Sequence, residues 1–553
     1  MQDDSAPAES SATDKDDVWS IASIPPRFSK LLGALDDAAF THNISAYEGF
    51  GSFHSGNVEE LIAVESGAYH PPLLPPFARR VLGRSELCQL LAAKDEEERM
   101  EIRKRPIQRC EFGLPFRQEH FTVTPEFVFI NHGAFGGTLC GALAIKHGYE
   151  ELMERQVVEY MDRELLPLVV YSVRRLAEFF NANPQQVVLL QNATFALNCA
   201  MQLIAKDDVV AFFDTEYLSV YKMMYFRCES VGATLHEVSL TRHLHDASIM
   251  GDDAALTDEI CRQLPSGCTT AVFDYVTSTT ALCLPVFTHI IPALRKRGVT
   301  KIIVDGAHAP LQLHLDFNDL PAASKPSVFV GNLHKWFSIA KSVGFIWVNN
   351  SILDSFHSVV LSHGAGDGFL SEFIWDGTRD YGAYLCIPAV IDFWRLQGVE
   401  RVRDHCAHLL QSAAKMLTSR FGTRPVARHA PFMSLVELPE ALQGPYLTAK
   451  YIQDLLHDIY MLEVPVKRVE GRFYVRISAF VYNTPGEYVY LREAVLGIAR
   501  NWLHSELQRR LLPRGAGDPA DPSLPCDKRI REQGGCGVSG LEPVVKKRRG
   551  TRF

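Results

Sequence analysis

The chain has 553 residues, which is enough for several domains or for one large catalytic unit with appended segments. Hydrophobic residues make up 47% and charged residues 22% of it, which excludes a mostly disordered, collagen-like or fibrous protein. With 56 Lys and Arg against 65 Asp and Glu the net charge is −9, which argues against wholesale nucleic-acid binding. The 12 cysteines contain no C-x-x-C pair, so neither a zinc ribbon nor a disulfide scaffold is predicted.

The two ends of the chain differ from its middle. Residues 1–24 are predicted to form a disordered acidic tail, and they have neither the basic start nor the apolar core of a secretory signal. Residues 25–118 form an N-terminal extension of unknown role, in which 85–105 has a helical pattern with Ser85 as the expected cap. Residues 505–553 hold eleven bases against six acids and are predicted to be a basic disordered tail, with a nuclear-import signal or a nucleic-acid-binding patch as the alternative. Since no apolar run reaches the roughly 18 residues of a membrane span, we expect a cytoplasmic protein.

Between residues 119 and 390 short apolar runs alternate with helical stretches. Continuous apolar strands separated by helices are typical of a large, mostly parallel sheet covered by helices, and so of an α/β domain. The pattern predicts strands at 187–190, 209–213, 270–273, 301–304, 328–330 and 344–348, and helices at 139–160, 164–181 and 195–206. Residues 391–504 are predicted to form a smaller α+β domain, with helices near 397–420, 447–460 and 485–504 and strands near 432–438 and 472–478.

Polar residues follow three of these strands, where the carboxyl ends of a parallel sheet bind ligands. Asn192-Ala193-Thr194 opens a helix and could form an anion site, although plain N-capping explains this feature better when it is taken alone. Asp305 ends a strand and could bind a metal or a protonated nitrogen. His308 could complete a metal pair, but no third ligand is nearby. Lys335 follows the next strand and could be an amine nucleophile or a solvent-facing lysine.

Each of these features is weak alone, but together they form a constellation. An anion cradle, a carboxylate and a lysine come in that order in one α/β domain. Pyridoxal 5′-phosphate needs these three groups, for its phosphate, its ring nitrogen and its Schiff base. A P-loop phosphotransferase is the other interpretation, but the chain has no G-x-x-x-x-G-K-[ST] motif.

Several longer motifs then carry a family resemblance over about residues 116–500. They are FINHGAFGG, LLQNATFALN, VFDYVTSTTALCLPV, VDGAHAP, GNLHKWF, WDGTRDYGAYLCIPAVIDF and YVRISAFVYNTPGEY. In this order they resemble the class V aminotransferase family of fold type I pyridoxal-phosphate enzymes, in the branch of isopenicillin N epimerase-like proteins and L-cysteine desulfhydrases. The resemblance implies the fold type I architecture, pyridoxal 5′-phosphate as cofactor, no metal, a small amino-acid substrate and a homodimer.

The resemblance also implies a role for each residue that matches a family motif. Lys335 would form the Schiff base and, once freed, remove the Cα proton of the substrate. Asp305 would hold the proton of the pyridine nitrogen, and His308 would lie near the phenolic oxygen of the ring. The other implied contacts are the stacking of Tyr217 on the ring; the phosphate ligands Ala193 (through its backbone), Thr194, Asn332 and His334; Thr378 at the phosphate of the partner subunit; Arg476 on the substrate carboxylate; and Asn131 and Ser278 lining the site.

The chain departs from the branch at two positions near the cofactor. Tyr275 stands where the branch usually has His, and Thr279 stands where it usually has Pro or Met. Both departures bear on the choice of substrate.

Three reactions remain open on this cofactor. Elimination of a β-sulfur group gives pyruvate and ammonia, reprotonation on the opposite face gives an epimer, and reprotonation on the cofactor gives transamination. A cysteine desulfurase needs a cysteine from the small domain, but none lies between Cys406 and Cys526, although Cys386 or a tail cysteine stays open. The sequence therefore favours a C–S lyase acting on L-cysteine or a conjugate such as hercynylcysteine sulfoxide. An epimerase or aminotransferase is the alternative, and a non-catalytic scaffold the least favoured.

Overall fold

A computed structural model describes residues 55–105, 109–444 and 447–511. All of them belong to the second of two compact units, Phe50–Phe553. The predicted acidic tail, the extension up to residue 54 and the basic tail from residue 512 lie outside the described residues.

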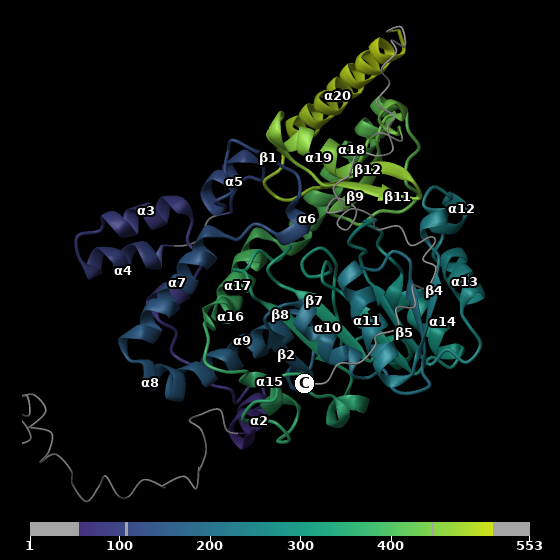
Figure 1. The fold of residues 1–553 in the computed structure, drawn as a ribbon. Helices are drawn as coiled ribbons and strands as arrows, with labels where there is room; N and C mark the ends of the chain where they lie inside the picture. The colour runs from purple at the N-terminus through teal and green to yellow at the C-terminus, as the bar shows by residue number, and fades with distance from the viewer. Residues whose placement is uncertain (1–54, 106–108, 445–446, 512–553) are drawn as a thin grey trace, which may run out of the picture. The chain divides into compact units, whose positions relative to one another are not determined.

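The centre of this unit is a seven-stranded sheet with the strand order β2-β8-β7-β6-β5-β3-β4 (Figure 1). Strands β3 to β7 run parallel, whereas β8 is antiparallel to both of its neighbours. The strands are β2 (Val187–Leu190), β3 (Val209–Phe213), β4 (Thr234–Val238), β5 (Thr270–Asp274), β6 (Lys301–Asp305), β7 (Val328–Asn332) and β8 (Gly344–Val348). The expected large, mostly parallel sheet is confirmed. The sequence missed β4 because this edge strand, TLHEV, lacks the continuous apolar run of a buried strand.

Helices cover the sheet and come from the connections between its strands. α10 packs against β7 and β8, and α9 packs against β2 and α17. The main helices here are α7 (Cys140–Arg155), α9 (Leu165–Phe179), α10 (Ala193–Met201), α11 (Leu218–Val231), α13 (Asp253–Gln263), α14 (Ile291–Lys296), α15 (Phe369–Ile374), α16 (Gly382–Leu385) and α17 (Ile387–Gln397). The single helix expected over 139–160 ends at Arg155; α8 (Val157–Glu159) and a π-helical turn (Tyr160–Glu164) then lead into α9.

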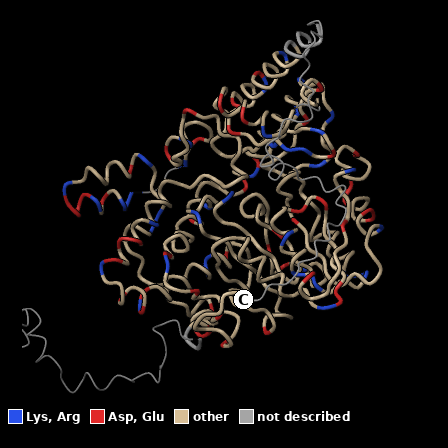
Figure 2. Tube along the Cα trace, in the orientation of Figure 1, with Lys and Arg blue, Asp and Glu red and all other residues tan. Residues whose placement is uncertain are grey.

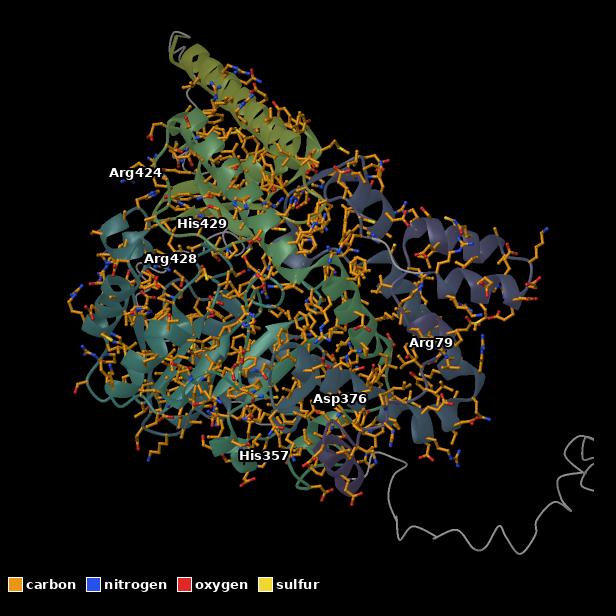
Figure 3. All side chains as sticks on the ribbon, turned by 180° about the vertical axis from the view of Figure 1, so that it is seen from behind. Arg79, His357, Asp376, Arg424, Arg428 and His429 are labelled. Carbon is orange, nitrogen blue, oxygen red and sulfur yellow. The ribbon has the colours of Figure 1, made fainter. Side chains whose placement is uncertain are left out.

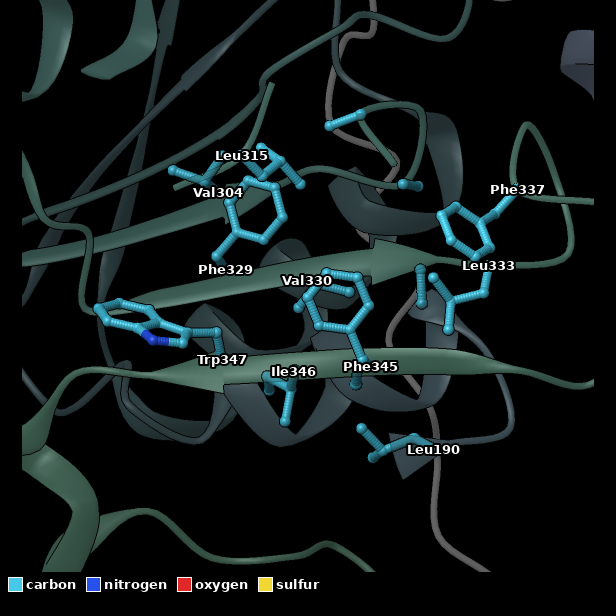
Figure 4. Packing of buried hydrophobic residues seen from close by; sticks show 14 of the residues in the cluster. Leu190, Val304, Leu315, Phe329, Val330, Leu333, Phe337, Phe345, Ile346 and Trp347 are labelled. Carbon is cyan, nitrogen blue, oxygen red and sulfur yellow. The ribbon is translucent and has the colours of Figure 1, made fainter. Parts of the chain in front are cut away.

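Aromatic side chains fill the space around the central strands (Figure 4). Phe317 stacks on Trp347 of β8 with ring centroids 4.9 Å apart, and Phe329 of β7 lies 5.1 Å from Phe317. Phe345 of β8 is 6.1 Å from Phe329. These rings are almost wholly removed from water, so they stabilise the sheet and hold its strand ends in fixed positions.

The C-terminal part has its own core around a three-stranded antiparallel sheet of order β11-β12-β9. Its strands are β9 (Met433–Glu437), β11 (Val466–Val469) and β12 (Arg472–Ser478), and its helices are α18 (Val399–Phe421), α19 (Ala449–Asp458) and α20 (Pro485–Leu511). A two-stranded parallel pair, β1 (Val128–Phe129) with β10 (Leu462–Glu463), joins this part to the start of the large domain. The helix α20 runs seven residues beyond 504, where we expected the tail to begin. The domain boundary near residue 391 stays a prediction.

The N-terminal extension packs on the large domain through α2 (Ser55–Ala63), which contacts α9 and α15. The helix expected over 85–105 is in fact two helices, α3 (Arg84–Ala92) and α4 (Glu96–Lys104). The helix is interrupted between them because the side chain of Asp95 caps the start of α4 by accepting a hydrogen bond from the backbone N–H of Glu98. At the start of α3 the capping position is occupied by Gly83 and not by the expected Ser85. α4 (EEERMEIRK) is rich in charged side chains, whereas α3 carries only Arg84 and Glu86 (Figure 2). Within the described residues, none of the helices is long and apolar enough to cross a membrane.

Candidate active site

Polar side chains gather at one edge of the seven-stranded sheet, where its parallel strands end. Asp274, Asp305 and Asn332 are the last residues of β5, β6 and β7, and Glu216 lies three residues after β3. Strand β2, which runs in the same direction, ends just before Asn192. The carboxyl edge therefore brings together residues that are more than one hundred positions apart in the sequence.

Lys335 lies at this edge, three residues beyond β7. Its Nζ is 2.9 Å from Nε2 of His308. Burial lowers the pKa of Lys335 to about 8, and the nearby Asp305 opposes part of that shift. The backbone of Gly136, directly after the short helix α6 (His132–Phe135), lies against the backbone of His334 and Lys335. Gly136 has φ = 72°, and a Cβ there would lie 2.2 Å from the carbonyl oxygen of His334. A buried lysine with a lowered pKa can act as a nucleophile and as a base.

Three buried carboxylates face one another beside this lysine. Oxygen atoms of Glu216, Asp274 and Asp305 lie within 4.8 Å of one another. Burial raises the pKa of all three carboxyl groups, and Asp305 raises the pKa of both Glu216 and Asp274 further. Oε2 of Glu216 and Oδ2 of Asp274 are buried without a hydrogen-bond partner. Such a group could bind a cation, because it is a concentration of buried negative charge with unused oxygen atoms.

The sequence predicted only Asp305 of this group. Asp274 could have been found, because it directly ends the apolar run of β5, as Asp305 ends that of β6, and the two residues are paired in register. Glu216 lies in a loop, and its approach to the other two follows from β3 being next to β5.

The anion cradle lies at the start of α10. The side chain of Asn192 accepts from the backbone N–H of Phe195 at 2.9 Å and so caps the helix. The backbone N–H of Ala193 donates to Oδ1 of Asn332 at 2.9 Å, which ties the helix start to the end of β7, and Thr194 is exposed on the next position. His334 donates from Nδ1 to the carbonyl of Val343 at 3.1 Å, and burial lowers its pKa to about 4. A phosphate here would meet a helix N-terminus and a Thr hydroxyl.

The residues predicted to bind substrate also lie together. Arg476 of β12 is 4% exposed and donates to the carbonyl of Ser278 and, at 3.3 Å, to Oδ1 of Asn131. Its Nε has no partner, and within the described part of the chain it forms no ion pair with a carboxylate. Burial lowers the pKa of Arg476 to about 10. This buried cation lies close enough to lower the pKa of Lys335 as well.

Besides Thr194, two more of the predicted residues are exposed on the surface of this single chain. Tyr217 is 48% exposed at the start of α11, and its side chain lies close enough to act on the pKa of Arg476. Thr378 is exposed on a loop that Arg379 and Asp376 hold by an ion pair of 2.6 Å (Asp376 is labelled in Figure 3). The structure does not join Thr378 to the other site residues within one chain.

Tyr275, one of the two departures from the branch, lies away from the lysine. Its ring packs against Phe287 at 5.0 Å and Phe329 at 6.4 Å. Successive strand residues point to opposite faces, so Asp274 faces the carboxylates while Tyr275 faces the hydrophobic core. The exchange at this position therefore changes core packing rather than the lining of the site.

The residues present fit pyridoxal 5′-phosphate. The orphaned oxygens of Glu216 and Asp274 beside Asp305 suit a protonated ring nitrogen, and the start of α10 suits the phosphate. Lys335 follows β7 at the same edge of the sheet, with its amine next to His308. No family model matches the chain.

Individual relatives do match. The putative L-cysteine desulfhydrase 2 of Oryza sativa subsp. japonica is 30% identical over 407 residues, which cover 66% of this chain and 83% of that protein. The chain belongs to the class V aminotransferase-like family of fold type I pyridoxal-phosphate enzymes. The probable chloroplastic L-cysteine desulfhydrase of Arabidopsis thaliana is 28% identical over 405 residues, 68% of this chain and 84% of that one. The isopenicillin N epimerase of Streptomyces clavuligerus is 26% identical over 390 residues, 67% and 94% of the two chains.

Solved structures of this fold agree with the family. The cystine C–S lyase C-DES, in complex with cysteine persulfide, matches with a TM-score of 0.57 at 15% identity over 67% of this chain and 97% of that one. The apo cysteine desulfurase from Thermococcus onnurineus NA1 also gives a TM-score of 0.57 at 15% identity, over 71% and 100% of the two chains. These likenesses show the fold type I architecture. This member of the family is a pyridoxal-phosphate-dependent lyase, and its cofactor is pyridoxal 5′-phosphate.

Proposed function

We propose that this enzyme is a C–S lyase that removes the sulfur group from L-cysteine or a cysteine conjugate, giving a sulfur product, pyruvate and ammonia. The observation that carries the proposal is the buried guanidinium of Arg476, which has no carboxylate partner in the described structure, has an Nε without a hydrogen-bond partner, and lies close enough to lower the pKa of Lys335. A substrate α-carboxylate would supply the missing counter-ion through a charge-assisted pair. The names of the plant relatives support cysteine as the amino acid.

Different residues of the chain would carry out different steps of such a reaction. The bound cofactor would draw electrons from Cα of the substrate and so make its proton acidic. Arg476 would bind the carboxylate, which fixes the position of Cα, and the amine of Lys335 would take the proton from it. The pKa of Lys335, about 8, suits this step because it lies well below the ordinary value of a lysine, so a usable fraction of the amine is neutral near physiological pH. The Cα–H electron pair then expels the β-sulfur, and water releases pyruvate and ammonia.

The positions of the cysteines favour elimination over transfer of the sulfur to the protein. The thiol of Cys386 is buried and donates to the carbonyl of Ala142 at 3.1 Å, and burial raises its pKa far above the ordinary value. Cys406, the cysteine of the described C-terminal part, is also wholly buried, and its pKa is raised for the same reason. Cys526 and Cys536 lie outside the described residues. Within the part that the structure describes, therefore, neither of these two cysteines could carry a persulfide.

We also propose that the enzyme acts as a homodimer in which Thr378 reaches the phosphate at the partner's site. Its exposed position, on a loop that the Arg379–Asp376 pair holds, supports this arrangement. Large apolar side chains that are exposed in the single chain support an interface as well, among them Phe135 next to the lysine loop and Phe226 on α11. Removal of the Thr378 hydroxyl by Thr378→Ala would then weaken cofactor binding without loosening the fold of the subunit.

The proposal is tested by the absorption spectrum of the purified protein and by assays of sulfide, pyruvate and ammonia after addition of L-cysteine. We expect a visible cofactor band and the three products in equal amounts. Lys335→Ala should lose the band and at least about 10³-fold in activity. The exposed Lys296, at the end of α14, gives the matched control: Lys296→Ala should keep both.

Other outcomes would contradict the proposal in different ways. A D-amino acid formed without pyruvate would replace the lyase by an epimerase. Turnover of S-substituted cysteines or of hercynylcysteine sulfoxide, but not of L-cysteine, would move the substrate to the conjugates. A protein that shows no band after pyridoxal 5′-phosphate is added would overturn the function as a whole.

A further inference from the structure

Three buried nitrogen-bearing side chains form a continuous hydrogen-bonded row at the lysine. Nε1 of Trp336 lies 3.3 Å from Nδ1 of His308, and Nε2 of the same imidazole lies 2.9 Å from Nζ of Lys335. Trp336 and His308 are almost completely buried, so solvent does not compete for these contacts. His308 is thus held from both sides.

The direction of the hydrogen bonds in this row follows from the chemistry of its first member. An indole N–H can only donate, so Nδ1 of His308 must accept. A neutral imidazole that accepts at Nδ1 carries its proton on Nε2, and that N–H donates to Lys335. An ammonium group has no lone pair to accept with, so this arrangement requires Lys335 to be the neutral amine.

The charges around the row agree with this direction. Burial, reinforced by the nearby Lys335 and Arg476, lowers the pKa of His308 well below its ordinary value, so the imidazole is neutral. On the other side of the lysine, Asp305 and Asp274 raise its pKa and Arg476 lowers it, while the third acid, Glu216, raises the pKa of Asp274. The acids alone would favour the ammonium form of Lys335, and the N–H of His308 opposes them.

Trp336 is well placed to fix the imidazole because its own position is rigid. Its indole is fully buried between Phe432 and Phe480, with ring centroids 5.4 and 5.9 Å away, and His132 stacks on it at 5.1 Å. Two of these rings come from the C-terminal part of the chain. The packing of that part against the large domain therefore determines where the indole N–H points.

We propose that Trp336 is a positioning residue, which fixes His308 in the tautomer with its proton on Nε2 and thereby holds Lys335 as a neutral amine. The same N–H is then directed at the nitrogen by which Lys335 joins the cofactor. A donor so directed disfavours protonation of that nitrogen. This inference rests on the proposed roles of Lys335 and His308 at the cofactor.

The test is a pH titration of the visible cofactor band in the holoenzyme, compared between wild type and Trp336→Phe. Phenylalanine keeps an aromatic ring but has no N–H, so His308 can adopt the tautomer that carries its proton on Nδ1. Nε2 of His308 can then accept a hydrogen bond from a protonated nitrogen of Lys335. We expect the pH midpoint of the band to rise by about one unit, the effect of losing one hydrogen bond of this kind. The midpoint is a spectroscopic readout that a general loss of packing would not move in this direction.

Trp347 gives the matched control. It is also buried, but its Nε1 has no hydrogen-bond partner, so Trp347→Phe leaves a similar cavity without removing a hydrogen bond (Figure 4). The inference stands if Trp336→Phe raises the midpoint and Trp347→Phe does not. It is overturned if neither variant moves the midpoint or if both move it equally.

A second variant covers the case in which Trp336→Phe does not fold. Replacement of Trp336 by a benzothiophene analogue of tryptophan keeps the bicyclic shape and exchanges only the N–H for sulfur. It should give the same rise, and an unchanged midpoint would overturn the inference. A wild-type protein without any cofactor band would instead contradict the proposed function, and this inference would fall with it.

Discussion

Two buried arginines lie in two regions of this molecule, and they differ in what surrounds them. Arg117 of α5 (Leu114–His120) is 7% exposed and is paired with Glu487 of α20 at 3.3 Å. It also donates to the carbonyls of Thr124 and Phe127. Arg476 at the carboxyl edge is equally buried, but it contacts a carbonyl and an amide and has no carboxylate partner among the described residues.

Arg117 therefore stabilises the fold, whereas Arg476 is available to bind a ligand. A buried ion costs several kcal/mol unless a counter-ion and hydrogen bonds compensate it. At the junction of α5 and α20 the chain itself supplies the compensation. At the carboxyl edge it leaves Arg476 without a counter-ion and leaves oxygens of Glu216 and Asp274 without partners, so the compensation must come with substrate and cofactor.

The largest effect is expected from breaking the compensated pair. Arg117→Ala leaves Glu487 buried without its cation, and burial already raises the pKa of that carboxyl group. We expect a loss of about 3–5 kcal/mol in the free energy of unfolding, measured by denaturant titration. The substrate KM of the protein that remains folded should not change.

The double variant Arg117→Met with Glu487→Leu is the control, because it removes both charges and leaves apolar side chains of similar size. It should recover most of the lost stability. If the double variant is as unstable as Arg117→Ala, the ion pair is not the cause, and packing of α5 on α20 is.

Arg476→Gln should have the opposite profile. It removes a buried cation that has no counter-ion in the described structure, so the thermal midpoint of the cofactor-free protein should stay the same or rise. The loss of a charge-assisted clamp should lower kcat/KM by about 10²-fold, mainly through KM. A fall in stability as large as that of Arg117→Ala would show that Arg476 is structural after all.

The sequence predicted most of the sheet and the order of the site residues along the chain. Strands such as Val187–Leu190 are continuous apolar runs, and that pattern is strong because both faces are buried. Half-exposed β4 and the break between α3 and α4 were missed, because the first has little apolar signal and the second depends on one capping contact, Asp95 with Glu98.

The site could be predicted only as far as motifs and strand ends reach. Lys335 and Asp305 follow or end their strands, so a one-dimensional pattern finds them, whereas Asn332 was implied only by the family motif GNLHKWF. The contribution of Glu216 depends on which strands are neighbours, and that of Trp336 depends on the packing of the C-terminal part. Neither relation is local in the sequence, and so the sequence alone gave no reason to select them.

The smallest effect is expected from Glu216→Gln. This variant extends the comparison to two buried glutamates, one without and one with a cationic partner. Glu437 of β9 is as buried as Glu216 but has Arg472 at 2.6 Å. The raised pKa of Glu216 means that the folded protein keeps a proton which the unfolded chain loses, so stability falls as pH rises from the ordinary carboxyl pKa through the folded one. Glutamine is neutral at every pH, so Glu216→Gln should raise the stability of the cofactor-free protein by about 1–2 kcal/mol at pH 8 and by less at pH 5. Glu437→Gln breaks the ion pair with Arg472 and should lower the stability at pH 8. The measurement is thermal unfolding of both variants. If the two variants respond equally, the carboxylates at the edge of the sheet are as well compensated as the one on β9.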